Sequence, residues 1–217
     1  MSEAQPTAAT PDLQPGEAFA ALYREPQSLR ERKKQRTRRA LRQEGYRLFA
    51  EQGWEATTVD QIAAAAEVSP ATFFRYFPTK EDLVLSDEYD PSMAAALLAR
   101  PLDEPFLVSA RAVLVPMYRV VMEHDRDETL TRLRLMVEVP ALRGRMLQGA
   151  EPQAMFLAVL TRRAGLQEPT LDMRVLVAAF TAALLEAMLY WAEQGGEQDL
   201  TVMLDRTIAA LDKSFRI

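Results

Sequence analysis

Residues 58–80 read TVDQIAAAAEVSPATFFRYFPTK, and the pattern of caps, apolar residues and prolines in this segment is the most informative in the chain. Thr58 and Gln61 form a capping box that opens a helix. Four apolar residues follow with the i, i+3, i+4, i+7 spacing of one helix face: Val59, Ile62, Ala63 and Ala66. Glu67 and Val68 then make a tight turn. The stretch therefore begins with a short capped helix that ends in a turn.

A second short helix follows the turn. Ser69 supplies its N-cap, and Pro70 suits the first helical position because an N–H there would have no helical partner. Phe73 and Phe77 lie at i, i+4 and point to the same side, and Pro78 ends the helix. Two helices this close are typical of the helix-turn-helix motif, whose second helix lies in the DNA major groove.

The side of the second helix opposite its two core phenylalanines is expected to meet the groove. The hydroxyls at the edges of that side, and a lysine at the start of the following helix, are expected near phosphates. The predicted DNA contacts are Arg32, Arg36, Arg39, Thr58, Ser69, Pro70, Ala71, Thr72, Phe74, Arg75, Tyr76 and Lys80.

The charges are distributed unevenly along the chain. Nine basic residues against two acidic ones give residues 30–47 a charge of +7, although the whole chain carries −5. Residues 81–217 hold 21 acidic and 14 basic side chains, so the chain has a basic head on an acidic body. Alone, the basic run would equally suit a solvated helix face or a nuclear-localisation-like patch. Beside a helix-turn-helix, phosphate contact becomes the better interpretation.

Residues 58–80 resemble the DNA-binding domain of TetR-family repressors, whose usual form reads roughly TVxxIAxxAGVSxGTLYRHFxSK. The resemblance covers about residues 30–85. Glu67 and Ala71 replace two glycines of that form, and a left-handed Glu67 would cost about 1 kcal/mol. Phe74 and Tyr76 replace its common Tyr and His. Residues 73–83, FFRYFPTKEDL, resemble an actinobacterial variant of the family. The resemblance implies a repressor and, more weakly, an acyl-CoA-like effector.

The rest of the chain also reads as helical. Ser28 and Glu31 open a helix to about Gln52, with Leu41, Gly45, Leu48 and Phe49 on its inner face, and Gly53 stops it. After the motif, Thr79 and Asp82 open a helix expected to run towards Asp90, where Pro91 must break, kink or restart it. Further helices are expected from Asp103 to about His124, from about Thr129 to Val139, from Pro140, from Pro152 to Ala164, from about Pro169 to Gln194 and from Asp199 to Phe215.

These elements predict an all-α protein without a convincing strand. We expect a disordered N-terminal tail over residues 1–27, a three-helix DNA-binding domain with a helix-turn-helix over 28–80, and a helical ligand-binding and dimerisation domain over 81–217.

The helix from Asp103 to His124 is predicted to be central, because nearly every residue from Phe106 to Met122 is apolar. Pro116 within it predicts a bend and a small polar opening. Each nearby methionine is most simply explained as core filling, although flexible thioethers also adapt to apolar ligands. The candidate ligand pocket comprises Val113, Met117, Val120, Val121, Met136, Phe156, Phe180 and Leu184.

The last two helices are expected to form an antiparallel hairpin around Gly195 and Gly196, with more apolar surface than one hairpin needs. Two copies packed about a two-fold axis would bury that surface as a four-helix bundle. The predicted dimer interface comprises Phe180, Leu184, Ala187, Met188, Trp191, Met203, Leu204, Ile208 and Leu211.

The sequence lacks the residues and motifs that several kinds of catalysis and cofactor binding require. The chain has no cysteine, one histidine (His124) and eight glycines, and it shows no metalloprotease, P-loop, Rossmann or nucleophile-elbow pattern. The acidic residues 123–128 lack EF-hand spacing and are interpreted as a solvated helix junction. We expect that the protein is not an enzyme, binds no cofactor or metal and does not span a membrane. We expect it in the cytoplasm.

Two classes of function remain. The first is a ligand-responsive transcriptional regulator that binds a palindromic operator as a homodimer and is released by a small lipophilic or acyl-CoA-like effector. The second is a helical protein-interaction module whose basic first helix binds an acidic partner. The second leaves the pattern from Ser69 to Lys80 unexplained.

Overall fold

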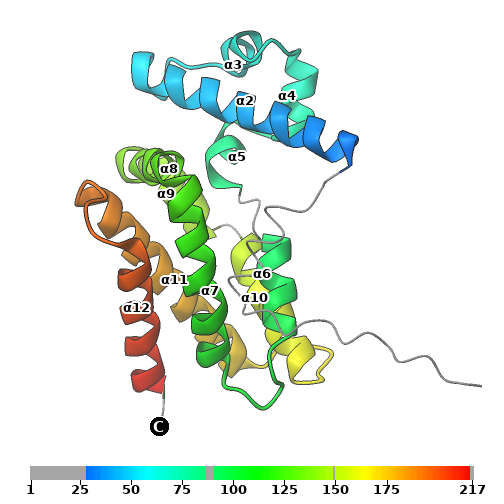
Figure 1. Ribbon diagram of the computed structural model, residues 1–217, viewed down its shortest axis with the longest axis vertical. Coiled ribbons are helices and arrows are strands. Elements are labelled where there is room, and N and C mark those ends of the chain that lie inside the picture. The colour runs from blue at the N-terminus through cyan, green and yellow to red at the C-terminus, as the bar shows by residue number, and fades with distance from the viewer. Residues whose placement is uncertain (1–27, 87–89, 149, 216–217) are drawn as a thin grey trace, which may run out of the picture.

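The computed structural model describes residues 28–86, 90–148 and 150–215, which form eleven helices and no strand. The all-α prediction is therefore confirmed for this part of the chain. A head of four helices sits on a longer helical body (Figure 1). The predicted N-terminal tail lies outside the described residues, and the limits of the two domains stay a prediction.

The head contains α2 (Leu29–Gln52), α3 (Val59–Ala65), α4 (Pro70–Tyr76) and α5 (Lys80–Leu85). As predicted, α2 ends before Gly53, which has a φ of +85°, and turns Leu41 and Phe49 into the core. Gly45 allows α5 to approach closely, because a Cβ there would lie 3.0 Å from Cδ1 of Leu83. The predicted inner face of α2 is confirmed.

Local hydrogen bonds place the ends of the short helices. The side chain of Thr58 accepts from the Gln61 N–H at 3.2 Å, and the Gln61 side chain accepts from the Thr58 N–H at 2.9 Å, which completes the predicted capping box. Side chains also cap the next two helices: Ser69 accepts from the Thr72 N–H at the start of α4, and Thr79 accepts from the Asp82 N–H at the start of α5. Glu67 adopts the left-handed conformation with φ +56°, so the turn carries the strain that a glycine would avoid.

The connection after α5 differs from the prediction. The helix does not run towards Asp90: it ends at Leu85, and Ser86 is extended with ψ 134°. A guanidinium nitrogen of Arg42 donates to the Ser86 carbonyl at 2.6 Å, so that oxygen already has a partner from another helix. A new helix, α6 (Asp90–Leu98), restarts with Pro91 in its first turn, where no N–H is required.

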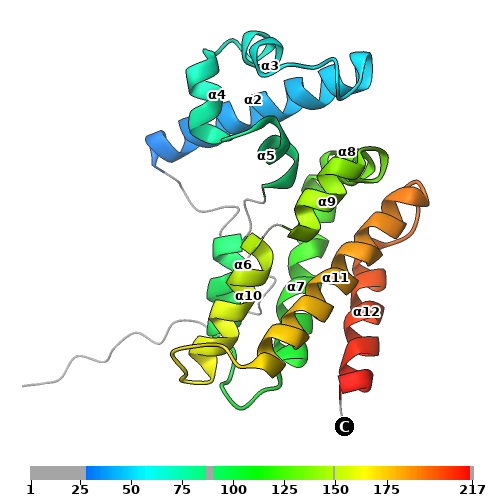
Figure 2. The same cartoon turned by 180° about the vertical axis from the view of Figure 1, so that it is seen from behind.

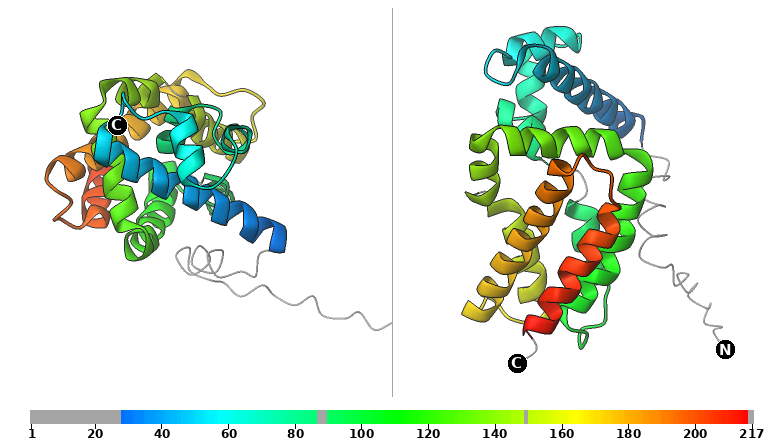
Figure 3. Two further views of the ribbon diagram at one scale, coloured as in Figure 1. Left: turned by 90° about the horizontal axis from the view of Figure 1, so that it is seen from above. Right: turned by 90° about the vertical axis from the view of Figure 1, so that its left-hand side faces the viewer.

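The body is built around α7 (Phe106–His124), which buries nine side chains as predicted and passes through Pro116. Around it lie α8 (Arg126–Glu138), α9 (Pro140–Gln148), α10 (Ala150–Arg163), α11 (Leu171–Glu193) and α12 (Leu200–Phe215). Figure 2 shows α6 beside α10 and α11 beside α12. In the right-hand view of Figure 3, the green α8 crosses the top of the body beneath the head.

Two helices of the body begin earlier than predicted. α8 begins at Arg126 rather than Thr129, because the Asp125 carbonyl already accepts from the Thr129 N–H at 2.9 Å. α10 begins at Ala150, which leaves Pro152 inside the first turn, where proline is tolerated.

The predicted hairpin of α11 and α12 is confirmed. It turns at Gly195 and Gly196, whose φ values are +77° and +74°. Space is also tight at the turn, since a Cβ on Gly196 would lie 3.0 Å from Cδ1 of Leu130. The Trp191 indole N–H donates to the Gln198 carbonyl at 2.7 Å and closes the loop.

Candidate nucleic-acid interface

Helix α4 has one buried face and one exposed face. Phe73 and Phe77 are completely buried, and their ring centroids lie 5.7 Å apart in the core of the head. Four residues of the opposite face are exposed: Pro70, Ala71, Phe74 and Arg75. The Phe74 side chain remains 52% exposed, an unusual position for a large aromatic ring. The predicted division of this helix into two faces is confirmed.

The hydroxyl groups at the start of α4 bond to each other. Ser69 Oγ and Thr72 Oγ1 lie 3.0 Å apart, and Ser69 Oγ accepts from the Thr72 N–H at 3.1 Å. At the other end of the helix, the Arg75 guanidinium lies 5.3 Å from the ring centre of Tyr76, which is half-buried. The exposed rim of α4 therefore offers hydroxyl groups at one end and a guanidinium at the other.

Lys80 does not extend towards solvent as the predicted phosphate contact requires. Its ammonium donates to the carbonyls of Trp54 at 2.8 Å and Thr57 at 3.0 Å, and it lies 4.3 Å from the Trp54 ring centre. Turning this ammonium towards a phosphate would break both hydrogen bonds and the cation–π contact. The structure thus corrects the role of the Lys80 side chain, which holds the loop between α2 and α3.

The basic residues of α2 divide into two groups. The first group, near the N-terminus of the helix, is exposed, as the predicted phosphate contacts Arg32 and Arg36 require: Arg30, Arg32, Lys33, Lys34 and Arg36. The second group makes ion pairs and cation–π contacts with other residues of the protein. Arg47 pairs with Glu44 at 2.8 Å and with Glu51 at 2.7 Å, and the guanidinium carbons of Arg38 and Arg42 lie 4.9 and 5.7 Å from the Phe77 ring centre. The number of positive side chains on α2 that a partner can contact is therefore smaller than the net charge of +7 suggests.

The junction of α7 and α8 is the predicted solvated acidic cluster only in part: Glu123 and Asp127 are exposed, whereas Asp125 and Glu128 face arginines of α2. Arg42 Nη1 lies 3.8 Å from Glu128 Oε1, and Arg39 Nη2 lies 3.8 Å from Asp125 Oδ1. Arg39, predicted to contact DNA, thus lies near the body although its side chain is 65% exposed. A small cavity of about 30 Å³ opens beside these groups, lined by Arg42, Tyr118, Val121, Asp125, Glu128, Thr129 and Arg132. Burial raises the pKa of the Glu128 carboxyl, and the positive charge of Arg42 opposes that shift.

A second link joins head and body between α5 and α9. Arg145 lies 3.3 Å from Glu81 Oε2 and 3.0 Å from Asp82 Oδ1. The two acidic side chains stand in the first turn of α5, where the helix dipole favours negative charge. The head is therefore joined to the body at α2 and at α5.

The comparisons with known proteins agree with this architecture. Residues 41–86 match the family described as bacterial regulatory proteins of the tetR family, and residues 104–216 match the MftR C-terminal domain. The chain is 36% identical over 167 residues to the HTH-type transcriptional regulator TcmR of Streptomyces glaucescens, which covers 71% of this chain and 72% of TcmR. The chain belongs to the TetR family of transcriptional regulators.

Solved structures of TetR-family regulators share the fold. The fatty acid degradation regulator FadR from Bacillus halodurans is 20% identical, with a TM-score of 0.53 over 82% of this chain and 96% of FadR. NalD, the secondary repressor of the MexAB-OprM multidrug efflux pump in Pseudomonas aeruginosa, is 16% identical, with a TM-score of 0.54 over 84% of this chain and 96% of NalD. TetR-family regulators bind DNA and small-molecule effectors, generally as dimers, and are generally non-enzymatic, soluble cytoplasmic proteins.

In this TetR-family body, the predicted pocket residues meet in the core. All are buried except Val120, which is half-buried. Phe106, which the sequence did not single out for the pocket, joins Phe156 and Phe180 in an edge-to-face cluster with centroid distances of 5.2 to 6.1 Å. Val121 also lines the small cavity at the junction. That these residues bind an effector stays a prediction.

The predicted dimer interface needs correction at most of its positions. Phe180, Leu184, Met188, Trp191, Leu204 and Ile208 are buried within the single chain, and Ala187, Met203 and Leu211 are half-buried. Helical periodicity identified the apolar residues of α11 and α12 but did not separate the face packed on α7 and α8 from the outer face. The large apolar side chains exposed on these two helices are instead Leu171, Val175, Tyr190 and Val202.

By length and composition alone, α11 is the one described helix that could cross a membrane. Its most apolar window has a mean hydropathy of 1.8 and is 39% buried. Core helices of soluble proteins pass the same test, so one such helix is weak evidence for a membrane span. The exposed apolar residues of α11 have a second explanation, a partner subunit.

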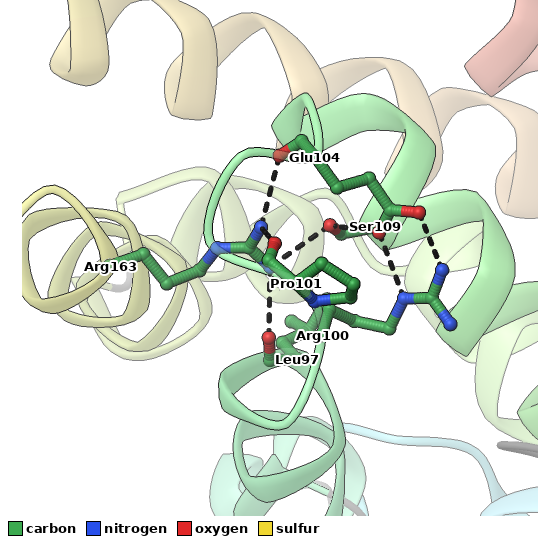
Figure 4. Close-up of polar contacts among 6 residues, drawn as sticks. All are labelled: Leu97, Arg100, Pro101, Glu104, Ser109 and Arg163. Carbon is green, nitrogen blue, oxygen red and sulfur yellow. Dashed lines mark hydrogen bonds and ion pairs between the residues drawn. The ribbon is translucent and has the colours of Figure 1, made fainter.

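A polar cluster that the sequence did not predict joins α6, α7 and α10 (Figure 4). Arg163 Nη1 donates to Leu97 O at 3.0 Å and to Ser109 Oγ at 2.9 Å, while Nη2 donates to Pro101 O at 2.6 Å and to Glu104 O at 3.0 Å. The one signal in the sequence was Ser109, the single serine in the apolar run of α7. The cluster fixes the loop between α6 and α7 against α10.

Proposed function

We propose that this chain is a homodimeric repressor that binds a near-palindromic operator through α4 and is released by a small lipophilic or acyl-CoA-like effector. The exposed face of α4 carries this proposal. Phe74 and Arg75 stand in solvent on a helix that Phe73 and Phe77 anchor to the core. A rigid helix with an exposed guanidinium and aromatic ring suits base edges in the major groove.

The outer face of α11 supports the homodimer. Leu171, Val175 and Tyr190 are 74%, 52% and 47% exposed, and they are spaced along one side of the helix. Alanines at positions 178 and 182 are exposed between them and allow a second helix to approach closely. Two such faces packed about a two-fold axis would form a four-helix bundle with α12. The axis would set two α4 helices about 34 Å apart, the length of one turn of DNA.

The composition of the body supports a lipophilic effector. α7, α10 and α11 meet through phenylalanine and methionine side chains, and a pocket opened among them would have apolar walls. The edge-to-face cluster of Phe106, Phe156 and Phe180 can separate to admit a chain, and Met117 and Met136 can repack around it. A thermal-shift screen of fatty acids and acyl-CoA thioesters tests this step.

An interaction with an acidic protein remains the second candidate, because Arg30, Lys33 and Lys34 are exposed on α2. That function would use the basic helix but would give the exposed face of α4 no role. The test is fluorescence anisotropy with DNA that flanks the gene of this protein, against random duplexes of the same length. Preference for the flanking DNA supports the repressor, and equal weak binding to both duplexes supports the alternative.

A further inference from the structure

Arg42 contacts three separate parts of the protein. Its guanidinium carbon lies 5.7 Å from the centre of the Phe77 ring, at the C-terminal end of α4. Nη2 donates to the Ser86 carbonyl, where the chain leaves α5 for the body. Nη1 faces the Glu128 carboxylate of α8. One side chain thus joins the recognition helix, the connector and the body.

Arginine suits this position because its guanidinium is planar, always charged and donates in several directions at once. The Arg42 side chain is 11% exposed and that of Glu128 is 28% exposed, so solvent screens this pair less than a surface pair. The link between Arg145 and Glu81 is more exposed, at 43% and 33%. Of the ion pairs described between head and body, the one between Arg42 and Glu128 is therefore the most shielded from solvent, and it is made to α8 itself.

Phe77 connects Arg42 to α4. This residue caps the C-terminus of α4, its N–H donates to the Phe73 carbonyl at 2.9 Å, and its ring is completely buried. Arg38 lies closer to the same ring, at 4.9 Å, so guanidinium groups from two turns of α2 hold it. A close-packed core does not absorb such a shift within one side chain.

We propose that Arg42 is a positioning residue through which Glu128 in the body sets the orientation of the recognition helix. This inference rests on the proposed DNA-binding function and adds the route by which the body controls the head. Glu128 therefore affects operator affinity without touching DNA, and it does so only when Arg42 is present. A movement of α8 would reach α4 by the same route.

The test is a double-mutant cycle on the full chain. Operator affinity is measured for wild type, Glu128→Gln, Arg42→Met and the double variant. Asp127→Asn is the matched control, because it removes the same charge from the adjacent residue, whose side chain is 97% exposed. We expect Glu128→Gln to change the dissociation constant about fivefold or more and Asp127→Asn to change it less than about twofold. When Arg42→Met is already present, adding Glu128→Gln should have no further effect on the dissociation constant.

Two outcomes overturn the proposal. Equal effects of Glu128→Gln and Asp127→Asn would show that only net charge near the DNA matters. If Glu128→Gln changes the operator dissociation constant by the same factor whether or not Arg42 is present, Glu128 acts by another route. The comparison of Glu128→Gln with Asp127→Asn stands even if the Arg42 variants fail to fold.

Hydrogen exchange of the α4 amides gives a readout that needs no DNA. Glu128→Gln should accelerate exchange at residues 73–77 about threefold or more, and Asp127→Asn should leave it unchanged. Suppose that the wild-type protein binds operator and random DNA equally well while Glu128→Gln still accelerates exchange in α4. In that case the proposed function fails, but the connection from Glu128 through Arg42 to α4 holds. If operator binding is specific but exchange in α4 is the same for both variants, the Arg42 route fails.

Discussion

The hydroxyl of Ser109, completely buried in α7, donates a hydrogen bond to Glu104 Oε2 at 2.6 Å. Arg100 donates to the same carboxylate from Nε at 2.8 Å and from Nη2 at 2.5 Å. In each of these bonds the acceptor is an oxygen of the ionised Glu104 carboxylate. The loop between α6 and α7 therefore depends on a charged carboxylate.

The first prediction concerns pH. The bonds from Arg100, and then the bond from Ser109, lower the pKa of Glu104 from 4.5 to about 2. The stabilisation is therefore present above pH 4.5 and is lost as the pH falls from 4.5 through 2, because the unfolded chain takes up the proton first. The free energy of unfolding of wild type and of Glu104→Gln is measured with urea at pH 7, 4 and 3. The difference between the two proteins should become smaller as the pH falls. A difference that stays constant would contradict this role.

The second prediction concerns Arg163, whose guanidinium bonds to three backbone carbonyls and one hydroxyl. Arg163→Met should lower the free energy of unfolding by about 3 kcal/mol, because it leaves those acceptors without their donor. Arg162→Met is the control, since this neighbouring side chain is exposed. Chemical denaturation measures both, and equal losses would show that the four bonds contribute little.

The third prediction concerns sequence readout by Arg75. Its exposed guanidinium on α4 is expected to contact a base edge, so Arg75→Ala should cost about 1–3 kcal/mol on the operator and much less on random DNA. Arg47→Ala also removes one charge from the head, but Arg47 is paired with Glu44 and Glu51, so it should change both affinities little. If Arg75→Ala weakens both DNAs by the same factor, Arg75 contacts a phosphate instead.

The fourth prediction concerns Lys80. Since its ammonium bonds to the carbonyls of Trp54 and Thr57, Lys80→Met should lower the free energy of unfolding by about 1–3 kcal/mol. Hydrogen exchange should rise in the loop between α2 and α3 even without DNA. A variant that unfolds like wild type and yet binds all DNA more weakly would restore the phosphate contact expected from the sequence.

The fifth prediction concerns the dimer. Val175→Glu places a charge on the exposed face of α11 and should raise the dimer dissociation constant by about tenfold or more, measured by sedimentation. Leu102→Glu is the control, because Leu102 is 72% exposed in the loop between α6 and α7. Phe180→Glu should instead unfold the body, since Phe180 has no exposed surface. A dimer unaffected by Val175→Glu would place the interface elsewhere.

Features of the fold that depend on near neighbours in the chain could be predicted from the sequence alone. The caps at Thr58 and Ser69 and the buried face of α4 each rest on residues three or four positions apart, and helix geometry brings such residues together in any fold. The strain at Glu67 follows from a local turn in the same way. For this reason short-range residue patterns are sufficient to locate the helix-turn-helix.

Three features depend on how the helices pack together: the buried face of α11, the direction of the Lys80 side chain and the contacts of Arg42. α11 is apolar on several sides, so its sequence did not separate the core face from the outer face. The partners of Arg42 and Lys80 lie far away in the chain, and a long charged side chain reaches whichever acceptor the packing of helices brings near it. Sequence periodicity reports that a residue is apolar or charged, whereas its partner depends on how α2, α5 and α8 meet.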